Sequence, residues 1–368
     1  MQFADPVAPL AAQPTVLKNL RLPSRLVRSA TAEHIPVGDE ASAQELGALY
    51  RRIGEGGAGL VITGHVAVHP SGRTGPRQPG LFTTQQAEAW RLVFEEAHKA
   101  LAKVLVQINH AGGYAPVDMA GGPRWCVSSV PHGKPAMPGP EMSEKQIKAL
   151  MAAFARAASS AIDAGADGIQ IHAAHGYVVS QFLSPLTNRR RDHWGGDLSG
   201  RARFLIETAR AVRASVGTHV PVGVKLGAAD GDPAGLRLDD TLQVAAWLQE
   251  DPGIDFVEVS GAFHPDVIRR RISHPDSEAY YLEWARTFRK ALRIPVIAVG
   301  GFRSPAIIEN ALQSGACDLV SASRPFIREP DFPKRIFAGE TSQCESCNRC
   351  LVSTDGSLRC RRLSTPPA

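Results

Sequence analysis

The chain has 368 residues, of which 43% are hydrophobic and 21% charged, and its formal net charge is +5. These values are typical of a globular protein with one large barrel or two domains, and no run approaches the roughly 18 apolar residues of a membrane span. Tight basic runs occur only at residues 189–191 and 269–271. No aromatic residues that could stack on bases are interleaved with them, which argues against nucleic-acid binding.

In chain order, the first residues carry an acid and a proline where a secretory signal would carry positive charge and an apolar run, so we expect a cytoplasmic protein. Short β-rich runs follow, and most of them are continuous apolar runs, which is typical of parallel strands that are covered on both faces. There are eight such runs, at residues 26–30, 60–63, 104–108, 168–171, 220–226, 256–259, 296–299 and 319–322.

Helical patterns lie between these runs. Ser143-Glu-Lys-Gln146 is typical of a capping box that opens a helix, which is expected to end near Gly165. Ser304 followed by Pro305 is typical of another helix start, and this helix is expected to stop at Gly315. Eight strand and helix units predict an α/β fold, a (β/α)₈ TIM barrel, with a doubly wound open sheet as the alternative.

In a barrel, the residues that follow the strands should together build one site. Gly300-Gly301 and Ser323-Arg324 follow the last two strands, where such barrels bind phosphate through backbone N–H groups and a cation. Lys225 would set a positive charge against an anionic ring. The other strand ends offer Ala30-Thr31, Gly64-His65, Asn109-His110, His172 with His175, and Ser260-Gly261.

The segment His172-Ala-Ala-His175-Gly-Tyr177 brings two imidazoles and a phenol to the end of one strand. Two histidines can donate to one oxyanion or carbonyl oxygen, and a tyrosine can supply a proton, which suits reduction of a polarised double bond. The alternatives are structural histidines or a metal pair. A metal site would find a third ligand only at His65 or His110.

The connection from 109 to 142 is rich in glycine and proline and shows no clear helix. Loops this long are usually functional or disordered. We expect it to cover the mouth of the barrel as a lid that faces substrate through Tyr114, Trp125 and His132.

At these positions the chain resembles the Old Yellow Enzyme family of FMN-dependent ene-reductases, also called NADH:flavin oxidoreductases. The resemblance runs from about residue 16 to residue 333 and is most specific in His172-Ala-Ala-His-Gly-Tyr177 and the following Gln181-Phe-Leu-Ser-Pro-Leu-Thr-Asn188. The segments 106–112, 299–301 and 323–325 are similar to the family's third-strand and phosphate-binding motifs.

The resemblance implies a role for each candidate residue. His172 and His175 would bind the activating oxygen of an alkene substrate, and Tyr177 would donate the proton. Lys225 would stand near flavin N1 and O2, and Gln107 would hydrogen-bond the pyrimidine edge. Further FMN contacts would come from the backbone of Ala30, Thr31 and Gly64 and, around the phosphate, from Gly300, Gly301, Ser323 and Arg324. Most members carry Arg in place of Lys225 and Gly in place of Ser323, so the flavin potential and substrate range do not transfer.

Four of the six cysteines follow the barrel pattern as Cys344-x2-Cys347-x2-Cys350-x9-Cys360. This spacing favours a metal site over disulfides and is similar to the cluster segment of the 2,4-dienoyl-CoA reductase branch of the family. A [4Fe–4S] cluster, zinc and no metal all remain open. We expect a barrel over residues 1–338 and a Cys-rich segment over 339–368, without the second flavin domain of larger members.

The sequence thus predicts an FMN-dependent enzyme that uses NAD(P)H to reduce a small activated alkene. The alternatives are a metal-dependent barrel hydrolase that uses the histidine pair and a non-catalytic flavin- or metal-binding protein. The sequence favours neither NADH nor NADPH and no particular oligomeric state.

Overall fold

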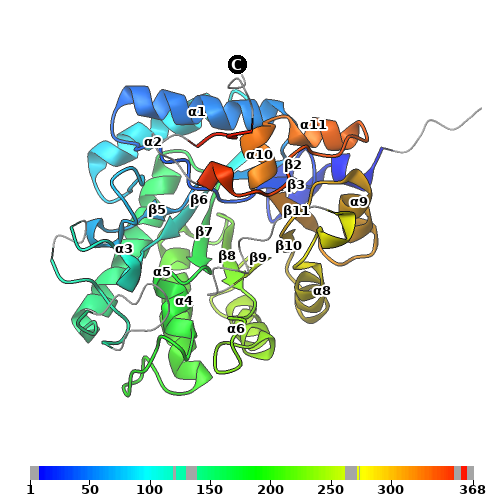
Figure 1. Ribbon diagram of the computed structural model, residues 1–368. Coiled ribbons are helices and arrows are strands. Elements are labelled where there is room, and N and C mark those ends of the chain that lie inside the picture. The colour runs from blue at the N-terminus through cyan, green and yellow to red at the C-terminus, as the bar shows by residue number, and fades with distance from the viewer. Residues whose placement is uncertain are drawn as a thin grey trace, which may run out of the picture.

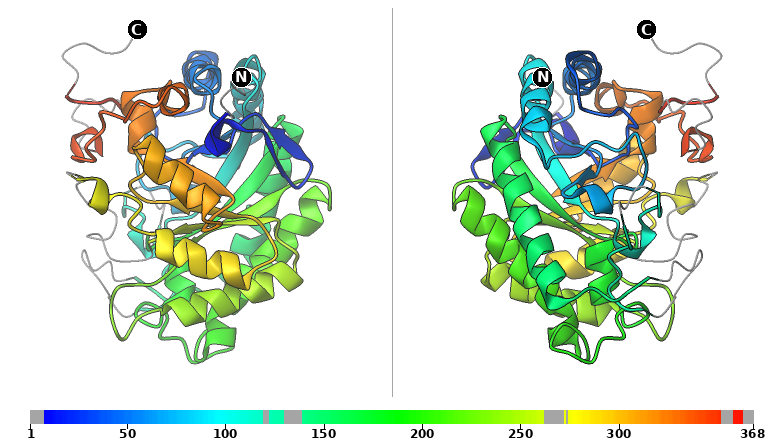
Figure 2. Two further views of the ribbon diagram at one scale, coloured as in Figure 1. Left: turned by 90° about the vertical axis from the view of Figure 1, so that its right-hand side faces the viewer. Right: turned by 90° about the vertical axis from the view of Figure 1, so that its left-hand side faces the viewer.

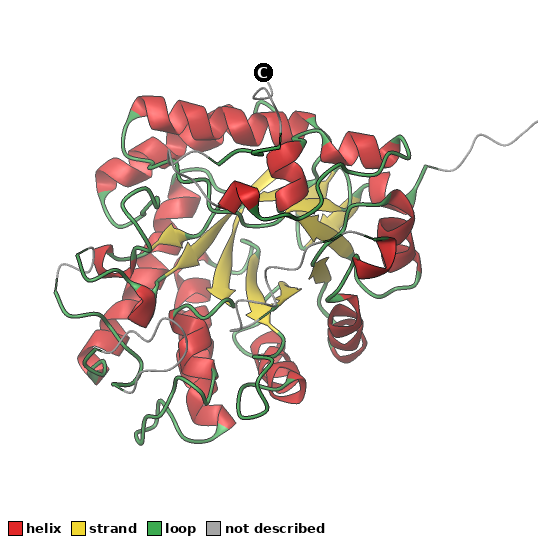
Figure 3. Cartoon of the chain, viewed as in Figure 1, coloured by secondary structure: helices red, strands yellow, loops and turns green. Residues whose placement is uncertain are grey.

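The computed structural model describes residues 8–118, 122–129, 139–261, 272, 274–351 and 358–362. Its centre is a closed ring of eight parallel strands with helices around it (Figure 1, Figure 3). Pairing of β11 with β3 and of β4 with β6 completes the ring. The strands are β3 (Leu26–Arg28), β4 (Leu60–Ile62), β6 (Lys103–Asn109), β7 (Gly168–Ala173), β8 (Val222–Gly227), β9 (Phe256–Ser260), β10 (Val296–Val299) and β11 (Leu319–Ala322).

The predicted TIM barrel is therefore confirmed, and each of the eight predicted runs overlaps one barrel strand. A short strand, β5 (Val66–Ala67), was not predicted; it pairs with the end of β6. It has two residues, too few to show a periodic pattern in the sequence.

Helices cover the outside of the ring in the order expected of a (β/α)₈ fold (Figure 1). The Ser143 side chain caps the third of them together with Gln146, as predicted. Pro305 does open its helix, but the Ser304 hydroxyl donates to Glu278 instead of capping. The helices are α1 (Glu40–Glu55), α2 (Thr84–Ala97), α3 (Glu144–Asp163), α4 (Val178–Leu183), α5 (Leu198–Val216), α6 (Leu238–Glu250), α8 (Leu282–Ala291), α9 (Pro305–Gln313), α10 (Arg324–Arg328) and α11 (Phe332–Phe337).

A hairpin that the sequence did not predict, β1 (Thr15–Leu17) with β2 (Leu20–Leu22), closes the N-terminal end of the barrel. Leu17 and Leu22 are buried in one cluster with Leu105 and Phe256 from the lower barrel interior. In the described part of the chain, apolar side chains close this end, so the barrel interior opens toward the opposite end, where the strands point.

The segment that follows α11 returns across that open end. Its described residues contain one short helical turn, η5 (Arg349–Leu351), and Figure 2 shows this turn beside the barrel. The Ile272 N–H donates to the carbonyl of Glu345 at 3.1 Å. Within the described residues, no helix is both long and apolar enough to cross a membrane.

Candidate active site

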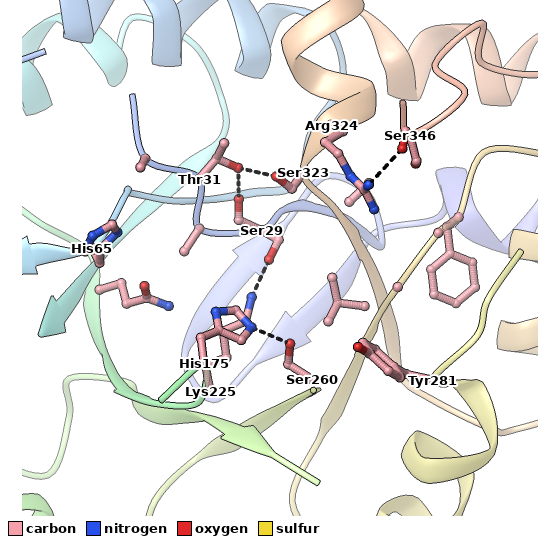
Figure 4. A pocket seen from close by; sticks show the side chains of 18 of the residues that line it. Ser29, Thr31, His65, His175, Lys225, Ser260, Tyr281, Ser323, Arg324 and Ser346 are labelled. Carbon is pink, nitrogen blue, oxygen red and sulfur yellow. Dashed lines mark hydrogen bonds between the residues drawn. The ribbon is translucent and has the colours of Figure 1, made fainter. Parts of the chain in front are cut away.

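A cavity of about 230 Å³ lies at the C-terminal ends of the strands, and residues at or just after the ends of all eight barrel strands line it (Figure 4). The structure brings every predicted catalytic and cofactor residue into its lining except Gly64. The lining includes Ala30, Thr31, Gln107, His172, His175, Tyr177, Lys225, Gly300, Gly301, Ser323 and Arg324.

Gly64 is predicted to contact FMN through its backbone, but it is not among the residues that line the cavity. Its backbone N–H donates to both carboxylate oxygens of Glu33, at 3.0 and 3.1 Å, so this donor is not available to a flavin. A Cβ atom on Gly64 would lie 2.1 Å from Glu33 Oε2 and 2.6 Å from the Thr31 carbonyl oxygen. Gly64 is therefore required for close packing behind the site.

A buried ion pair that the sequence did not reveal supports this wall. Arg28 and Glu33 are almost fully buried and lie 2.7 Å apart. Tyr50 also donates to the Glu33 carboxylate, at 2.8 Å, and Arg28 donates to the carbonyl oxygens of Ile62 and Thr31. A buried pair with these additional hydrogen bonds holds the loops after β3 and β4 in one arrangement.

The two histidines of the motif face the cavity with their ring centroids 5.0 Å apart. His172 points inward from β7, and its Nδ1 accepts the Ala174 N–H at 3.4 Å, which leaves the proton of the neutral ring on Nε2. His175 Nε2 lies 2.9 Å from Ser260 Oγ. His175 has a φ of 61°, a conformation that costs energy in a non-glycine residue and is typical of functional sites.

Burial keeps both imidazoles neutral. It lowers the pKa of His175 to about 3, with Lys225 adding to the effect. Burial, with smaller contributions from His175, His65 and Lys225, lowers the pKa of His172 well below its ordinary value. The pair can therefore donate hydrogen bonds from neutral rings near pH 7 without bringing a positive charge into the cavity.

Tyr177 lies at the start of α4, with its ring centroid 5.1 Å from that of His172. Burial raises its pKa to about 12, so its hydroxyl keeps the proton at neutral pH. The ring also stacks on His65 at 5.3 Å, and His65 lines the cavity. From the sequence, His65 is a residue after a strand and a candidate metal ligand, but its contact with Tyr177 is visible only in the fold.

Lys225 lines the cavity, and its ammonium group lies beside the buried carboxylate of Glu258. Its ammonium donates to Ser29 Oγ at 2.8 Å and lies 3.3 Å from Glu258 Oε1 (Figure 4 shows the Ser29 bond). Burial alone would raise the pKa of Glu258, but Lys225 and hydrogen bonds from neighbouring side chains lower it below its usual value. The lysine is thus one half of a buried ion pair.

Gln107 is held by a second amide. Its Nε2 donates to Gln170 Oε1 at 2.7 Å, and Gln170 Nε2 donates to Glu258 Oε2 at 2.9 Å. Because one amide hydrogen of Gln107 is used in this way, its carbonyl oxygen and second amide hydrogen remain to meet a ligand in the cavity.

The predicted phosphate end lies on the opposite side of the cavity (Figure 4). Gly300 and Gly301 have φ values of 123° and 83°, which favour glycine. Thr31 and Ser323 share a hydrogen bond of 2.7 Å between their hydroxyls. Arg324 donates to Asn348 Oδ1 at 2.6 Å and to the Ser346 carbonyl at 3.3 Å, so the C-terminal segment positions this guanidinium.

The four cysteines of that segment line one small cavity, of about 20 Å³, next to Arg324 and Arg328. Arg328 donates to Cys360 Sγ at 3.4 Å. Burial raises the pKa of Cys350 to about 11 and that of Cys344 above its usual value. Among the residues that the structure describes, no three His, Cys, Asp or Glu side chains are arranged to hold a single metal ion.

The described parts of the 109–142 loop do not line the cavity. Trp125 stacks on His69, with ring centroids 4.7 Å apart. Buried Arg190 holds the loop by donating to the carbonyls of Val127 and Met142, so this member of the basic run at 189–191 is structural. His132 lies outside the described residues.

Comparisons with known proteins agree with this geometry. The family model described as "NADH:flavin oxidoreductase / NADH oxidase family" matches residues 12–343. The NADH-dependent flavin oxidoreductase iccE of Talaromyces variabilis is 32% identical over 89% of this chain and 86% of that protein. The NADPH dehydrogenase of Bacillus pumilus is 33% identical over 87% of this chain and 92% of that protein.

Some relatives are longer. The chain spans 50% of the metal reductase of Desulforamulus reducens, to which it is 31% identical over 92% of its own length. A 2-naphthoyl-CoA reductase structure superposes with a TM-score of 0.85 at 24% identity, covering 93% of this chain and 54% of that one, which shows a shared fold. From the family match and the full-length relatives, the chain belongs to the NADH:flavin oxidoreductase family, the Old Yellow Enzyme family, and is an NAD(P)H-dependent flavin oxidoreductase.

Proposed function

We propose that the protein binds FMN without covalent attachment in the cavity and reduces an activated carbon–carbon double bond of enone, nitroalkene or enoyl type. The observation that carries this proposal is that two neutral histidines and a protonated Tyr177 share one cavity with Lys225 and Gln107. When bound, FMN would take a hydride from NAD(P)H and pass it to the substrate.

The cavity residues have the donor and acceptor types that FMN needs. Gln107 offers an acceptor and a donor to a pyrimidine edge, and Lys225 offers a positive charge to an anionic ring. At the other end, Gly300 and Gly301 line the cavity without side chains, so a phosphate could approach their backbone closely, and Arg324 would supply a cation for it. The cofactor site thus consists of an amide, two cations and a glycine turn.

The histidine pair would bind the substrate's carbonyl or nitro oxygen. Each neutral ring has one N–H, and that of His172 lies on Nε2. Hydrogen bonds to this oxygen grow stronger as negative charge develops on it during hydride addition to the β-carbon, so they favour the transition state over the bound substrate.

Tyr177 would complete the reaction by protonating the α-carbon. The substrate gains a hydride at the β-carbon and a proton at the α-carbon, and the tyrosinate is then reprotonated from solvent. Because burial raises the pKa of Tyr177 to about 12, the proton is present before each turnover and a strong base is left after its transfer.

We propose further that Cys344, Cys347, Cys350 and Cys360 bind a [4Fe–4S] cluster or zinc. Support comes from the spacing and from the fact that all four line one cavity. Metal and sulfide analysis of protein purified without oxygen tests this directly. Iron with sulfide would identify a cluster, and stoichiometric zinc would identify a zinc site. The absence of both metals would contradict the proposal.

A visible spectrum of the purified protein tests the main proposal. We expect flavin bands that disappear on anaerobic addition of NADH or NADPH and return when an enone is added. A protein that neither retains FMN nor takes it up on reconstitution would overturn the proposed function.

A further inference from the structure

Glu258 is fully buried beside Lys225, which lines the cavity, but Glu258 itself does not line it. It projects inward from β9: its neighbours Val257 and Val259 belong to the outer core, whereas Phe256 belongs to the barrel interior. Its carboxylate therefore lies inside the ring, one layer below the residues that would meet a flavin.

One arm of contacts leads from Glu258 to Lys225. The two residues are cross-strand neighbours in the register of β8 and β9, and their charged groups are 3.3 Å apart. Ser29 joins them, since its hydroxyl accepts from the ammonium at 2.8 Å and donates to Glu258 Oε1 at 2.6 Å. Every charge on this arm is shielded from water by the barrel.

A second arm leads to Gln107. Gln170 donates to Glu258 Oε2 at 2.9 Å and accepts from Gln107 at 2.7 Å, so the carboxylate fixes the orientation of both amides. An ionised carboxylate can only accept hydrogen bonds, so Gln170 must turn its NH₂ group toward Glu258. The carbonyl oxygen of Gln170 then faces the NH₂ group of Gln107. Both arms end on residues that line the cavity.

We propose that Glu258 is a positioning residue that lowers the reduction potential of the bound flavin by compensating the charge of Lys225. An unpaired lysine beside the flavin would stabilise the anionic reduced ring, and a carboxylate 3.3 Å from the ammonium offsets most of that field in a buried site. The inference rests on the proposed function, because it assumes that FMN binds beside Lys225.

A purely structural role for Glu258 is the competing explanation, because a protein that buries a charged lysine needs a partner for that charge in order to fold. The two roles differ in what they change. A structural partner affects stability and FMN retention, whereas a compensating charge shifts the flavin's reduction equilibrium in a defined direction.

The test compares flavin potentials, measured by anaerobic equilibration with a reference dye, in the FMN-loaded parent and in Glu258→Gln. We expect the reduction equilibrium to shift at least tenfold toward reduced flavin, about 30 mV for two electrons. The matched control is Ser321→Ala, which removes a 2.8 Å hydrogen bond to the same carboxylate without changing its charge and should shift the equilibrium less than threefold.

A double-mutant cycle with Lys225→Met shows whether the effect passes through the lysine. Without Lys225, the buried Glu258 loses its counter-charge and should take up a proton, so adding Glu258→Gln should have little further effect. An equal shift in both backgrounds, or equal shifts for Glu258→Gln and Ser321→Ala, would overturn the inference.

If Glu258→Gln does not fold, Glu258→Asp is the second variant. It keeps the charge but withdraws it from Lys225, so the potential should rise by less, and an unchanged potential would contradict the inference. Failure of this inference is distinguishable from failure of the proposed function, because in the latter case the parent protein itself would hold no FMN.

Discussion

Replacing Tyr177 with Phe should separate the two half-reactions of the enzyme. The substitution removes one hydroxyl and leaves the ring stacked on His65, so flavin reduction by NAD(P)H, which needs no protein acid, should keep its rate. The oxidative half-reaction with an enone should slow by about 10²- to 10⁴-fold, the usual contribution of a general acid. This corresponds to about 2.7–5.4 kcal/mol in activation free energy.

The structure also predicts the pH dependence of this step. Burial raises the pKa of Tyr177 to about 12 from an ordinary value of 10.0, so nearly all Tyr177 hydroxyls are protonated at every pH up to about 10. The pKa of His175 is lowered to about 3, so the histidine stays neutral above about pH 5. The oxidative rate of the parent should therefore be nearly flat between pH 6 and about 10.

Anaerobic stopped-flow mixing measures each half-reaction from the flavin absorbance. Tyr114→Phe is the matched control, because Tyr114 also has a pKa raised to about 12 but does not line the cavity. It should change the oxidative rate less than threefold. An unchanged oxidative rate in Tyr177→Phe, or a loss in Tyr114→Phe instead, would refute Tyr177 as the proton donor.

Four further outcomes are expected. Arg324→Ala should weaken FMN binding about ten- to a hundredfold in fluorescence titrations, because the phosphate loses a charge-assisted contact. Replacing His172 and His175 together with Ala should weaken binding of phenolate inhibitors, seen as a weaker long-wavelength charge-transfer band; unchanged binding would reject the oxygen site. Cys347→Ser should remove any metal and raise protease sensitivity after about residue 339; because the neighbouring Ser346 and Asn348 position Arg324, it should also weaken FMN binding, but by less than Arg324→Ala. Finally, His110 and His175 have pKa values lowered to about 3 in the fold but 6.5 ordinarily, so the unfolded chain binds more protons between these values. Urea unfolding should show full stability above pH 6.5 and a loss of about 1.4 kcal/mol per pH unit for each histidine as the pH falls below it.

The barrel could be predicted from sequence because its strands are buried on both faces, so that most of the predicted runs are largely apolar. The hairpin β1–β2 has only three residues in each strand and gave no comparable signal. The glycines were harder to interpret. Gly64 follows a strand just as Gly300 does, and only the position of the Glu33 carboxylate shows that its N–H faces away from the cavity.

Charged residues show a second limit of sequence reasoning. Arg28 and Glu258 each lie within a predicted strand run, but nothing local indicates that their partners are Glu33 and Lys225. The contact of Arg324 with Asn348 likewise joins the predicted phosphate end of the cavity to the cysteine segment, 24 residues further along the chain. Such pairs depend on how the strands and the final segment close over the barrel.

The two halves of the cavity control charge by different physical means. In the proposed substrate half, burial keeps His172, His175 and Tyr177 in their neutral forms, so that a developing negative charge would meet hydrogen bonds and a proton. In the proposed flavin half, Lys225 is paired with the carboxylate of Glu258 inside the barrel. A motif specifies residue types but not their protonation states or buried partners. This difference explains why the sequence predicts the type of reaction, whereas the potential at which it runs depends on contacts that only the fold creates.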